Sequence, residues 1–354
     1  MNDATPMPAQ TRTIFSSAPS PLGVYGTDPD QVIEAIRYRA LRQLTCRTAN
    51  DGRRIGLVIE GGGMRGSTTA GGALALAHLG LSGLFDDVYA TSAGVMNAAY
   101  FLSRQEDIGI SIYFDDLTTR AFFNPWRWWK VLDVDYVMED IVKGRKRLDL
   151  DRLRQSPSRF HVALLDRSNG ESFIVNTGRA KESIYAVLHA SLSVPVLYNR
   201  PVLVEGRPCM DGGLGIPFPL RHAIADSCTD ILVLQSHEIG YVPPEYALWQ
   251  HILFRTMCAR GSAGTWRTYR DRVKASTEYR DLACGHTSPP AGVNIATICT
   301  EPPYVRSLTT DRSALVRASA DFGRRTLAAL GATSVDWNLG PASAARLEPD
   351  ASAK

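Results

Sequence analysis

Residues 54–66, with the sequence RIGLVIEGGGMRG, decide the fold that we predict for this chain. Residues 54–60 form a short apolar run of the kind found in buried parallel strands. Four glycines, Gly61, Gly62, Gly63 and Gly66, follow within six positions, and an Ala/Leu-rich segment continues to residue 79. This order predicts a strand, a tight loop and a helix.

The same order is repeated immediately downstream. Residues 87–91 predict a second strand, Ser92 a turn, and residues 93–102 a second helix. Similar patterns predict further strands at 160–166, 172–175, 202–204, 231–235 and 294–299, and helices at 32–44, 181–192, 247–260, 263–282 and 311–330. Alternating strands and helices are typical of an α/β fold, so we expect a mainly parallel central sheet with helices on both faces.

The composition is that of an ordinary globular protein. Hydrophobic residues make up 44% of the 354 residues and charged residues 21%, and the formal net charge is +3. These values exclude a fully disordered chain. The 29 glycines have no three-residue period, which excludes a collagen-like chain. We expect one domain at 28–331, a flexible arm at 1–27 and a flexible tail at 332–354.

Signals for cofactors, nucleic acid and export are missing from the sequence. The six cysteines fall singly, without a CxxC pair or histidines at metal spacing, so we expect neither a metal nor a cofactor. The small net charge and the lack of a reader motif argue against nucleic-acid binding. Residues 1–23 lack the apolar core of a secretory signal, and the apolar run 70–85 is shorter than the roughly 20 residues that span a bilayer. We therefore expect a cytoplasmic protein.

The glycine loop Gly61-Gly62-Gly63-Met64-Arg65-Gly66 satisfies GxGxxG between a predicted strand and a predicted helix. Backbone N–H groups at a helix start can hold a phosphate or a developing oxyanion. A dinucleotide site also needs an acidic residue at the end of the second strand. Asp86 and Asp87 precede that strand instead. A nucleotide-binding module and a purely structural turn stay open as alternatives.

The second turn, Ala90-Thr91-Ser92-Ala93-Gly94, nearly matches the GxSxG nucleophile elbow, with Ala90 in place of the first glycine. The alternative is a serine that caps the following helix. Because a candidate oxyanion loop lies one strand–helix unit earlier, we favour the elbow.

A serine nucleophile needs a base, and none of the seven histidines stands in an obvious pattern with Ser92. Asp211 is the candidate base. It is followed by Gly212 and Gly213 and comes directly after a predicted hairpin at 202–209. A histidine base and an ordinary Asp-Gly turn are the alternatives.

The three motifs in this order resemble the patatin-like phospholipase family, whose bacterial members are serine acyl hydrolases with a Ser–Asp dyad. Residues 190–195, ASLSVP, also resemble a segment common before the family's Asp. The resemblance spans roughly residues 54–330 and implies an α/β/α sandwich. Ala90 is the one departure from the family's motifs.

The resemblance implies a role for each motif. Ser92 attacks an ester carbonyl, and Asp211 accepts its proton. The loop 61–66 forms the oxyanion hole, with Gly62 and Gly63 as donors and Met64 as a third candidate. Arg65 orients the loop, meets an anionic head group or is simply solvated. The implied function is hydrolysis of a lipid or another carboxylic ester; an acyltransferase with the same acyl-enzyme is the alternative.

Two further features bear on the substrate. Residues 121–130 contain five aromatic residues, Phe122, Phe123, Trp126, Trp128 and Trp129. This cluster is consistent with an acyl pocket, with peripheral contact to a bilayer, or with an ordinary packing patch. Basic residues gather at 143–154 and 255–274, where either solvated helix faces or attraction to anionic lipid explains them.

Overall fold

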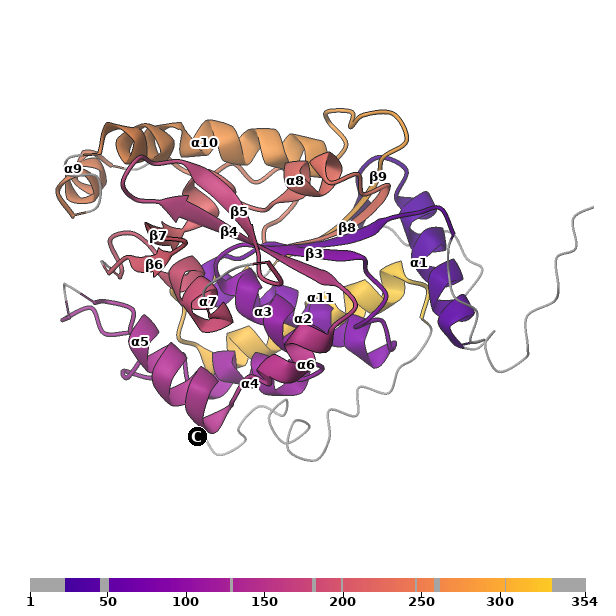
Figure 1. Cartoon of the computed structure of the whole chain (residues 1–354), viewed down its shortest axis with the longest axis horizontal. Helices are drawn as coiled ribbons and strands as arrows, with labels where there is room; N and C mark the ends of the chain where they lie inside the picture. The colour runs from indigo at the N-terminus through magenta and orange to yellow at the C-terminus, as the bar shows by residue number, and fades with distance from the viewer. Residues whose placement is uncertain are drawn as a thin grey trace, which may run out of the picture.

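The computed structural model describes residues 23–44, 51–127, 130–179, 183–198, 200–245, 247–257, 262–302 and 304–332. Within these ranges a nine-stranded sheet runs through the molecule with helices on both faces (Figure 1). The strands are β1 Val24–Tyr25, β2 Ile55–Ile59, β3 Asp87–Ala90, β4 Arg159–Asp166, β5 Ser172–Asn176, β6 Val202–Val204, β7 Arg207–Asp211, β8 Asp230–Gln235 and β9 Asn294–Cys299. The expected α/β architecture is confirmed.

The centre of the sheet is parallel. Its order is β1-β9-β8-β2-β3-β4-β7-β6, and β5 pairs with β4. The five strands from β9 to β4 run parallel, whereas β1, β5, β6 and β7 add antiparallel pairings at the two sides. Every residue of β2 and β8 is buried, because helices cover both faces of a parallel sheet.

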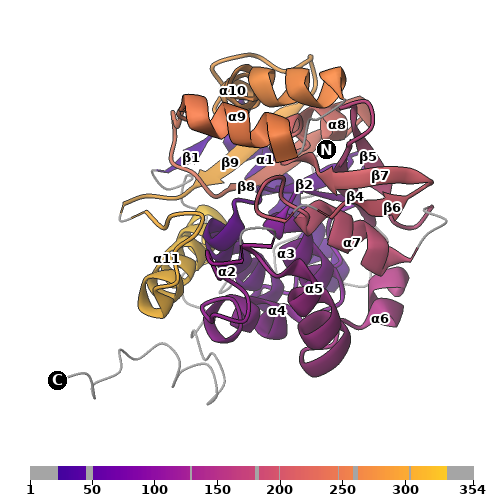
Figure 2. The ribbon, with the colours of Figure 1, turned by 90° about the vertical axis from the view of Figure 1, so that its left-hand side faces the viewer.

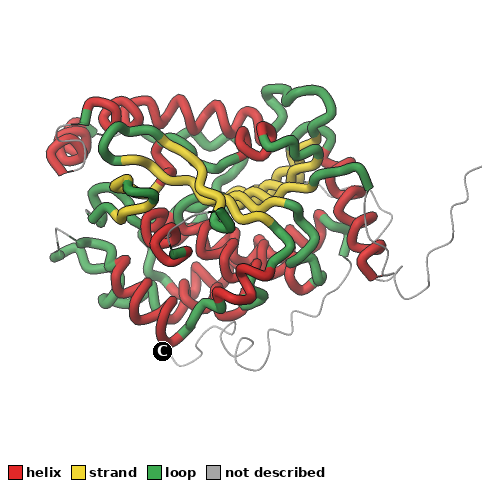
Figure 3. The backbone as a smooth tube through the Cα atoms, in the orientation of Figure 1, coloured by secondary structure: helices red, strands yellow, loops and turns green. Residues whose placement is uncertain are grey.

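The helices divide between the two faces. They are α1 Pro29–Leu44, α2 Gly66–His78, α3 Ala93–Leu102, α4 Glu106–Asp115, α5 Val134–Tyr136, α6 Leu150–Gln155, α7 Ile184–Leu192, α8 Leu220–Ala225, α9 Leu248–Met257, α10 Ala263–Ala283 and α11 Arg312–Ala329, with a π-helical turn at Val137–Arg145. Side chains of α8 and α10 pack with one set of strand residues, and those of α1, α2, α3, α7 and α11 with the alternate set. Figure 3 displays the resulting layers of helix, strand and helix.

Most predicted elements are found within a few residues of their expected ends. The elements that were not predicted include β1, α4, α5, α6 and the π-helical segment Val137–Arg145. β1 has only two residues, within the segment expected as an arm, and it pairs antiparallel with β9. In α4, Ile108, Ile110 and Ile112 alternate with Gly109 and Ser111, a pattern typical of a strand. The segment is nevertheless a helix, in which Ile110, Tyr113 and Phe114 pack with residues of α2 and α11. Residues 1–22 and 333–354, which include most of the expected arm and tail, lie outside the described residues.

The topology brings the three sequence motifs to one region. β2 and β3 are parallel neighbours, so the loops that follow them, 60–66 and 91–92, emerge side by side. β7 runs antiparallel to β4, with Asp211 opposite Leu164, whereas Ala90 of β3 lies opposite Val162 of the same strand. Asp211 is therefore level with the turn that follows β3.

Candidate active site

Ser92 stands on a strained turn between β3 and α3. Its backbone angles are φ 54° and ψ −134°, which a non-glycine residue adopts only where the surrounding structure enforces them. A serine that merely capped α3 would accept a helix N–H with its side chain, and Ser92 makes no such bond. Its own N–H donates to Ser191 Oγ at 3.0 Å. The geometry is that of a nucleophile elbow.

Close packing explains the small residues around Ser92. A Cβ added to Gly94 would lie 2.6 Å from the carbonyl oxygen of Ile59. Ala90 is fully buried opposite Ile59 in the β2–β3 pair, where its methyl group joins the core. The alanine that replaces the usual glycine is therefore accommodated without disturbing the turn.

The glycine loop touches the elbow directly. A Cβ on Gly61 would lie 2.4 Å from the carbonyl oxygen of Thr91 and 2.7 Å from the Cβ of Ser92. Gly62 and Gly63 follow with φ of 132° and 60°, values that glycine adopts without the steric penalty of a side chain. Only glycines allow the backbone to pass this close to Ser92.

Some backbone N–H groups of the glycine loop already donate hydrogen bonds within the protein, and others do not. Met64 N donates to the carbonyl oxygen of Ser307 at 3.0 Å, and Arg65 N to that of Gly62 at 3.2 Å. The N–H of Gly66 is directed at the carbonyls of Gly63 and Met64. Among the described residues, no acceptor bonds the N–H groups of Gly62 and Gly63. The N–H of Gly61 has no acceptor among these residues either, and Gly62 and Gly63 are the two unengaged groups that the family resemblance implies as donors.

Asp211 ends β7 beside Ser92. Its carboxyl group accepts a hydrogen bond from the Ser92 hydroxyl and another, at 2.9 Å, from the N–H of Gly213. Gly212 is required here because an added Cβ would lie 2.6 Å from the carbonyl carbon of Ala163. Burial raises the pKa of Asp211 to about 6, although both hydrogen bonds oppose the shift. A carboxyl group with this pKa is a stronger base than an exposed aspartate.

The histidines whose hydrogen bonds the structure describes bond residues other than Ser92. His161 Nε2 lies 2.8 Å from Asp87, and His189 Nε2 lies 3.0 Å from the Tyr198 hydroxyl. His237 borders the same cavity as Ser92, but its Nδ1 lies 3.0 Å from Glu60 Oε1. Within the described part of the chain, the side chain that bonds the Ser92 hydroxyl is that of Asp211.

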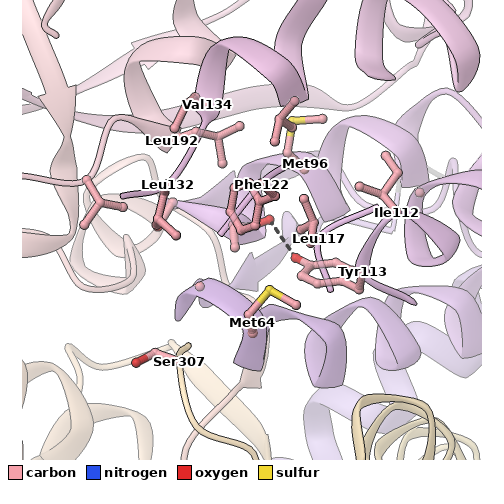
Figure 4. A pocket seen from close by; sticks show the side chains of 16 residues that line it. Met64, Met96, Ile112, Tyr113, Leu117, Phe122, Leu132, Val134, Leu192 and Ser307 are labelled. Carbon is pink, nitrogen blue, oxygen red and sulfur yellow. Dashed lines mark hydrogen bonds between the residues drawn. The ribbon is translucent and has the colours of Figure 1, made fainter. Parts of the chain in front are cut away.

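Two cavities meet at Ser92. One is a narrow apolar pocket between α3, α4 and the segment that leads into α5 (Figure 4). Its lining includes Met96, Ile112, Tyr113, Leu117, Phe122, Leu132, Val137 and Leu192. The other cavity has a volume of about 450 Å³ and a polar wall that includes Glu60, Arg65, Asp211, Arg272 and Arg280. Ser92 therefore lies between an apolar pocket and a wider cavity in which charged side chains occur among apolar ones.

The predicted aromatic cluster is divided between several environments. Phe122 lines the apolar pocket, as expected if the aromatic cluster contributes to an acyl pocket. The side chain of Trp126 is 89% exposed. Trp128 and Trp129 lie outside the described residues.

Three serines at the site were missed by the sequence reasoning. Ser191 accepts the N–H of Ser92, Ser307 accepts the N–H of Met64 through its carbonyl, and the Ser236 hydroxyl lies 2.7 Å from the carbonyl oxygen of Gly61. They lie between 99 and 243 residues along the chain from their partners. Only Ser191 carried a signal, because it belongs to the ASLSVP segment.

The site can now be compared with known proteins. The family model described as patatin-like phospholipase matches residues 57–224, which span the glycine loop, Ser92 and Asp211. Residues 57–224 belong to the patatin-like phospholipase family. The description of this family is that of a lipid acyl hydrolase.

This chain is distant in sequence from two individual proteins that match it. It is 25% identical over 280 residues to the uncharacterized protein YjjU of Escherichia coli strain K12, an alignment that covers 77% of this chain and 75% of that one. The crystal structure of VipD from Legionella pneumophila matches with a TM-score of 0.44 and 16% identity, covering 79% of this chain and 69% of that chain.

The described part of the chain offers neither a cluster of metal ligands nor a membrane-spanning helix. It contains no group of three or more His, Cys, Asp or Glu residues that could hold a metal ion. No described helix is both long enough and apolar enough to cross a bilayer.

The raised pKa of Asp211 predicts a stability that falls as the pH rises. The folded-state pKa of about 6 exceeds the ordinary value of 3.8. At pH values between these two, Asp211 is therefore protonated to a greater extent in the folded protein than in the unfolded chain. We expect Asp211→Asn to be more stable than wild type at pH 7.5 by on the order of 1–3 kcal/mol, with the difference shrinking toward pH 4. Urea unfolding at several pH values measures it.

The matched control is Asp151→Asn, whose side chain is 84% exposed. Its free energy of unfolding relative to wild type should change little over the same pH range. A difference for Asp211→Asn that stays constant with pH would contradict the burial of an ionisable carboxyl at this position.

Proposed function

We propose that the chain hydrolyses lipid or other carboxylic esters through a Ser92–Asp211 dyad. The observation that carries the proposal is the hydrogen bond between the hydroxyl of Ser92, on its strained turn, and the buried Asp211 carboxyl. The adjoining N–H groups of Gly62 and Gly63 supply the second requirement of acyl transfer, donors for a developing oxyanion.

The reaction follows from these contacts. Asp211 takes the hydroxyl proton as Ser92 Oγ attacks the ester carbonyl carbon, and the carbonyl oxygen becomes an oxyanion held by the N–H groups of Gly62 and Gly63. When the intermediate collapses, the ester bond breaks and the leaving alcohol takes the proton from Asp211. Water then gives a proton to Asp211 and attacks the acyl-enzyme, releasing the acid and restoring the Ser92 hydroxyl.

Each of the two cavities at Ser92 fits one half of the ester substrate. The apolar pocket bordered by Met96, Ile112 and Leu192 fits an acyl chain, since it offers hydrocarbon contacts and little else. The wider cavity, with Arg65 and Arg272 on its wall, takes the alcohol half of the ester. A second alcohol entering this cavity in place of water would give the acyltransferase alternative.

The nucleotide-binding alternative is disfavoured by the engaged N–H groups of the loop. A phosphate at the start of α2 would need the N–H groups of Met64, Arg65 and Gly66. These three already donate to backbone carbonyls.

Removal of the nucleophile should abolish turnover. We expect Ser92→Ala to lower kcat on a soluble short-chain ester by at least about 10⁴-fold and to eliminate labelling by a fluorophosphonate probe. The matched control is Ser103→Ala, a buried serine at the other end of α3 whose hydroxyl bonds the carbonyl of Tyr100. Labelling of Ser92→Ala at the wild-type rate would refute the assignment of the nucleophile.

The pKa of the proposed base, Asp211, predicts how the rate of the reaction depends on pH. Because Asp211 must be ionised to accept the proton, and burial raises its pKa to about 6, kcat/KM should increase through pH 6 and level off above pH 7. The measurement is kcat/KM of wild type and Asp211→Asn from pH 4.5 to 9. Residual activity of Asp211→Asn that keeps the wild-type profile would point to a histidine base.

We further propose that helix α9 rests on an anionic lipid surface. Its inner residue Phe254 is buried and stacks on Tyr269 at 3.8 Å, in a cluster with Leu214, which borders the wider cavity. Its outer residues Leu248, Trp249 and Ile252 are 75%, 64% and 56% exposed. Figure 2 presents α9 and α10 together on the side that is turned to the viewer.

The charge of this region complements anionic lipid. Residues 248–257 contain no Asp or Glu. Together with residues 263–274 they carry Arg255, Arg267, Arg270, Arg272 and Lys274 against Asp271. Exposed apolar residues flanked by cations are the pattern of an interfacial helix.

Weakening the apolar face of α9 should weaken lipid binding. We expect the double variant Trp249→Ala, Ile252→Ser to bind vesicles containing phosphatidylglycerol at least about tenfold less tightly, because two side chains no longer enter the lipid, while kcat/KM on a soluble ester stays unchanged. Vesicle co-sedimentation measures it. Ile108→Ser, an exposed isoleucine on α4, is the control. Equal binding by wild type and the double variant would eliminate α9 as the contact.

A further inference from the structure

Ser236 lies immediately behind the glycine loop and outside both cavities. It follows β8, is 1% exposed, and its Oγ is 2.7 Å from the carbonyl oxygen of Gly61. It does not border the space around Ser92. Ser236 can therefore act on the reaction only through the groups that it contacts, which are the loop backbone at Gly61 and the side chains of Glu60 and His237.

The Gly61 carbonyl and the Gly62 N–H belong to one peptide group. In a trans peptide these two groups point in opposite directions. A hydrogen bond that holds the carbonyl toward Ser236 consequently directs the N–H of Gly62 away from Ser236. Gly62 lines the wider cavity together with Ser92, so its N–H is kept on the cavity side of the loop.

Ser236 is itself anchored to a buried carboxylate. Its N–H donates to Glu60 Oε2 at 2.7 Å, and its Oγ lies 3.0 Å from the same oxygen. On the other side of Glu60, Arg280 Nη2 lies 2.6 Å from Oε1. Burial opposes ionisation, but Arg280 and His237 hold the pKa of the Glu60 carboxyl well below its usual range. The ionised carboxylate thus provides a fixed acceptor on which Ser236 is oriented.

Of the three peptide groups that join residues 61 to 64, the other two are held by backbone atoms. The Gly62 carbonyl, which is paired with the N–H of Gly63, accepts the N–H of Arg65 at 3.2 Å. The N–H of Met64, paired with the Gly63 carbonyl, donates to the Ser307 carbonyl at 3.0 Å. These are backbone hydrogen bonds. The Gly61–Gly62 peptide is the one in which a side-chain hydroxyl bonds the carbonyl.

We propose that Ser236 is a positioning residue, which aims the N–H of Gly62 at the oxyanion of the reacting ester. This inference rests on the proposed ester hydrolysis. Loss of the hydroxyl leaves the Gly61–Gly62 peptide free to rotate, because glycine on both sides offers little resistance. The donor is then in place for only part of the time, and the transition state loses stabilisation that the bound substrate does not use.

The test compares turnover with binding. A complete loss of an oxyanion donor typically costs about 10²–10³ in kcat, so we expect Ser236→Ala to lower kcat by about 10- to 100-fold, with KM changed by less than about twofold. A trifluoromethyl ketone inhibitor, which forms the tetrahedral adduct with Ser92, should bind Ser236→Ala more weakly by the same factor as kcat. A non-hydrolysable amide that mimics the substrate should bind unchanged. Ser236→Thr, which keeps the hydroxyl, should restore most of kcat.

The matched control is Ser158→Ala. Ser158 is also buried, at 7% exposure, and its hydroxyl also bonds a backbone carbonyl, that of Phe85 at 2.6 Å. It lies just before β4, at the opposite end of the strands from Ser92, so its loss should lower the Tm about as much as Ser236→Ala and leave kcat unchanged.

Several outcomes would overturn the inference. They are wild-type kcat for Ser236→Ala, an equal fall of kcat in Ser158→Ala, or weaker binding of the amide by the same factor as the ketone. If instead the wild-type protein neither turns over esters nor reacts with a fluorophosphonate, the proposed function itself fails. If wild type is active and Ser92→Ala is inactive, a normal Ser236→Ala overturns only the role of Ser236.

Discussion

The approach of the Gly61 backbone to Ser92 is the constraint on which the rest of the site depends. A single added carbon at Gly61 would lie 2.4 Å from the carbonyl oxygen of Thr91. This contact exists because β2 and β3 are parallel neighbours whose following loops meet at the same edge of the sheet. The glycines, the strained turn at Ser92 and the apolar pocket beside it are all arranged around this contact of two backbones.

The proposed chemistry uses burial in two opposite ways. At Asp211 burial dominates, and it raises the pKa of the carboxyl to about 6 because two hydrogen bonds are too few to offset the loss of water. At Glu60 an arginine and a histidine more than offset the same loss, and that pKa falls. One carboxyl is thus able to gain and lose a proton near neutral pH, whereas the other stays ionised. The difference suits a base and a structural anchor, respectively.

Much of the fold and part of the site could be predicted because both leave local patterns. An apolar run followed by glycines, as at 54–66, specifies a strand and a close turn within a few residues. Ser92 and Asp211 were proposed by the same means, since Gly94 lies two positions after Ser92 and two glycines follow Asp211 directly. α4 was not predicted, because the alternation of three isoleucines at 108, 110 and 112 resembles a strand and hides the helical spacing of the residues that pack against α2 and α11.

The sequence by itself determined the order of strands and helices, the family resemblance and the identity of the candidate nucleophile and base. Only the tertiary structure decided that the Gly61 carbonyl and the Met64 N–H of the loop are engaged, because their hydrogen-bond partners come from elsewhere in the chain. Ser236 is 175 residues from Gly61, and Ser307 is farther still from Met64. The pKa of Asp211 likewise depends on how completely the assembled fold excludes water. Hydrogen bonding and desolvation act through space, so no pattern of neighbouring residues records them.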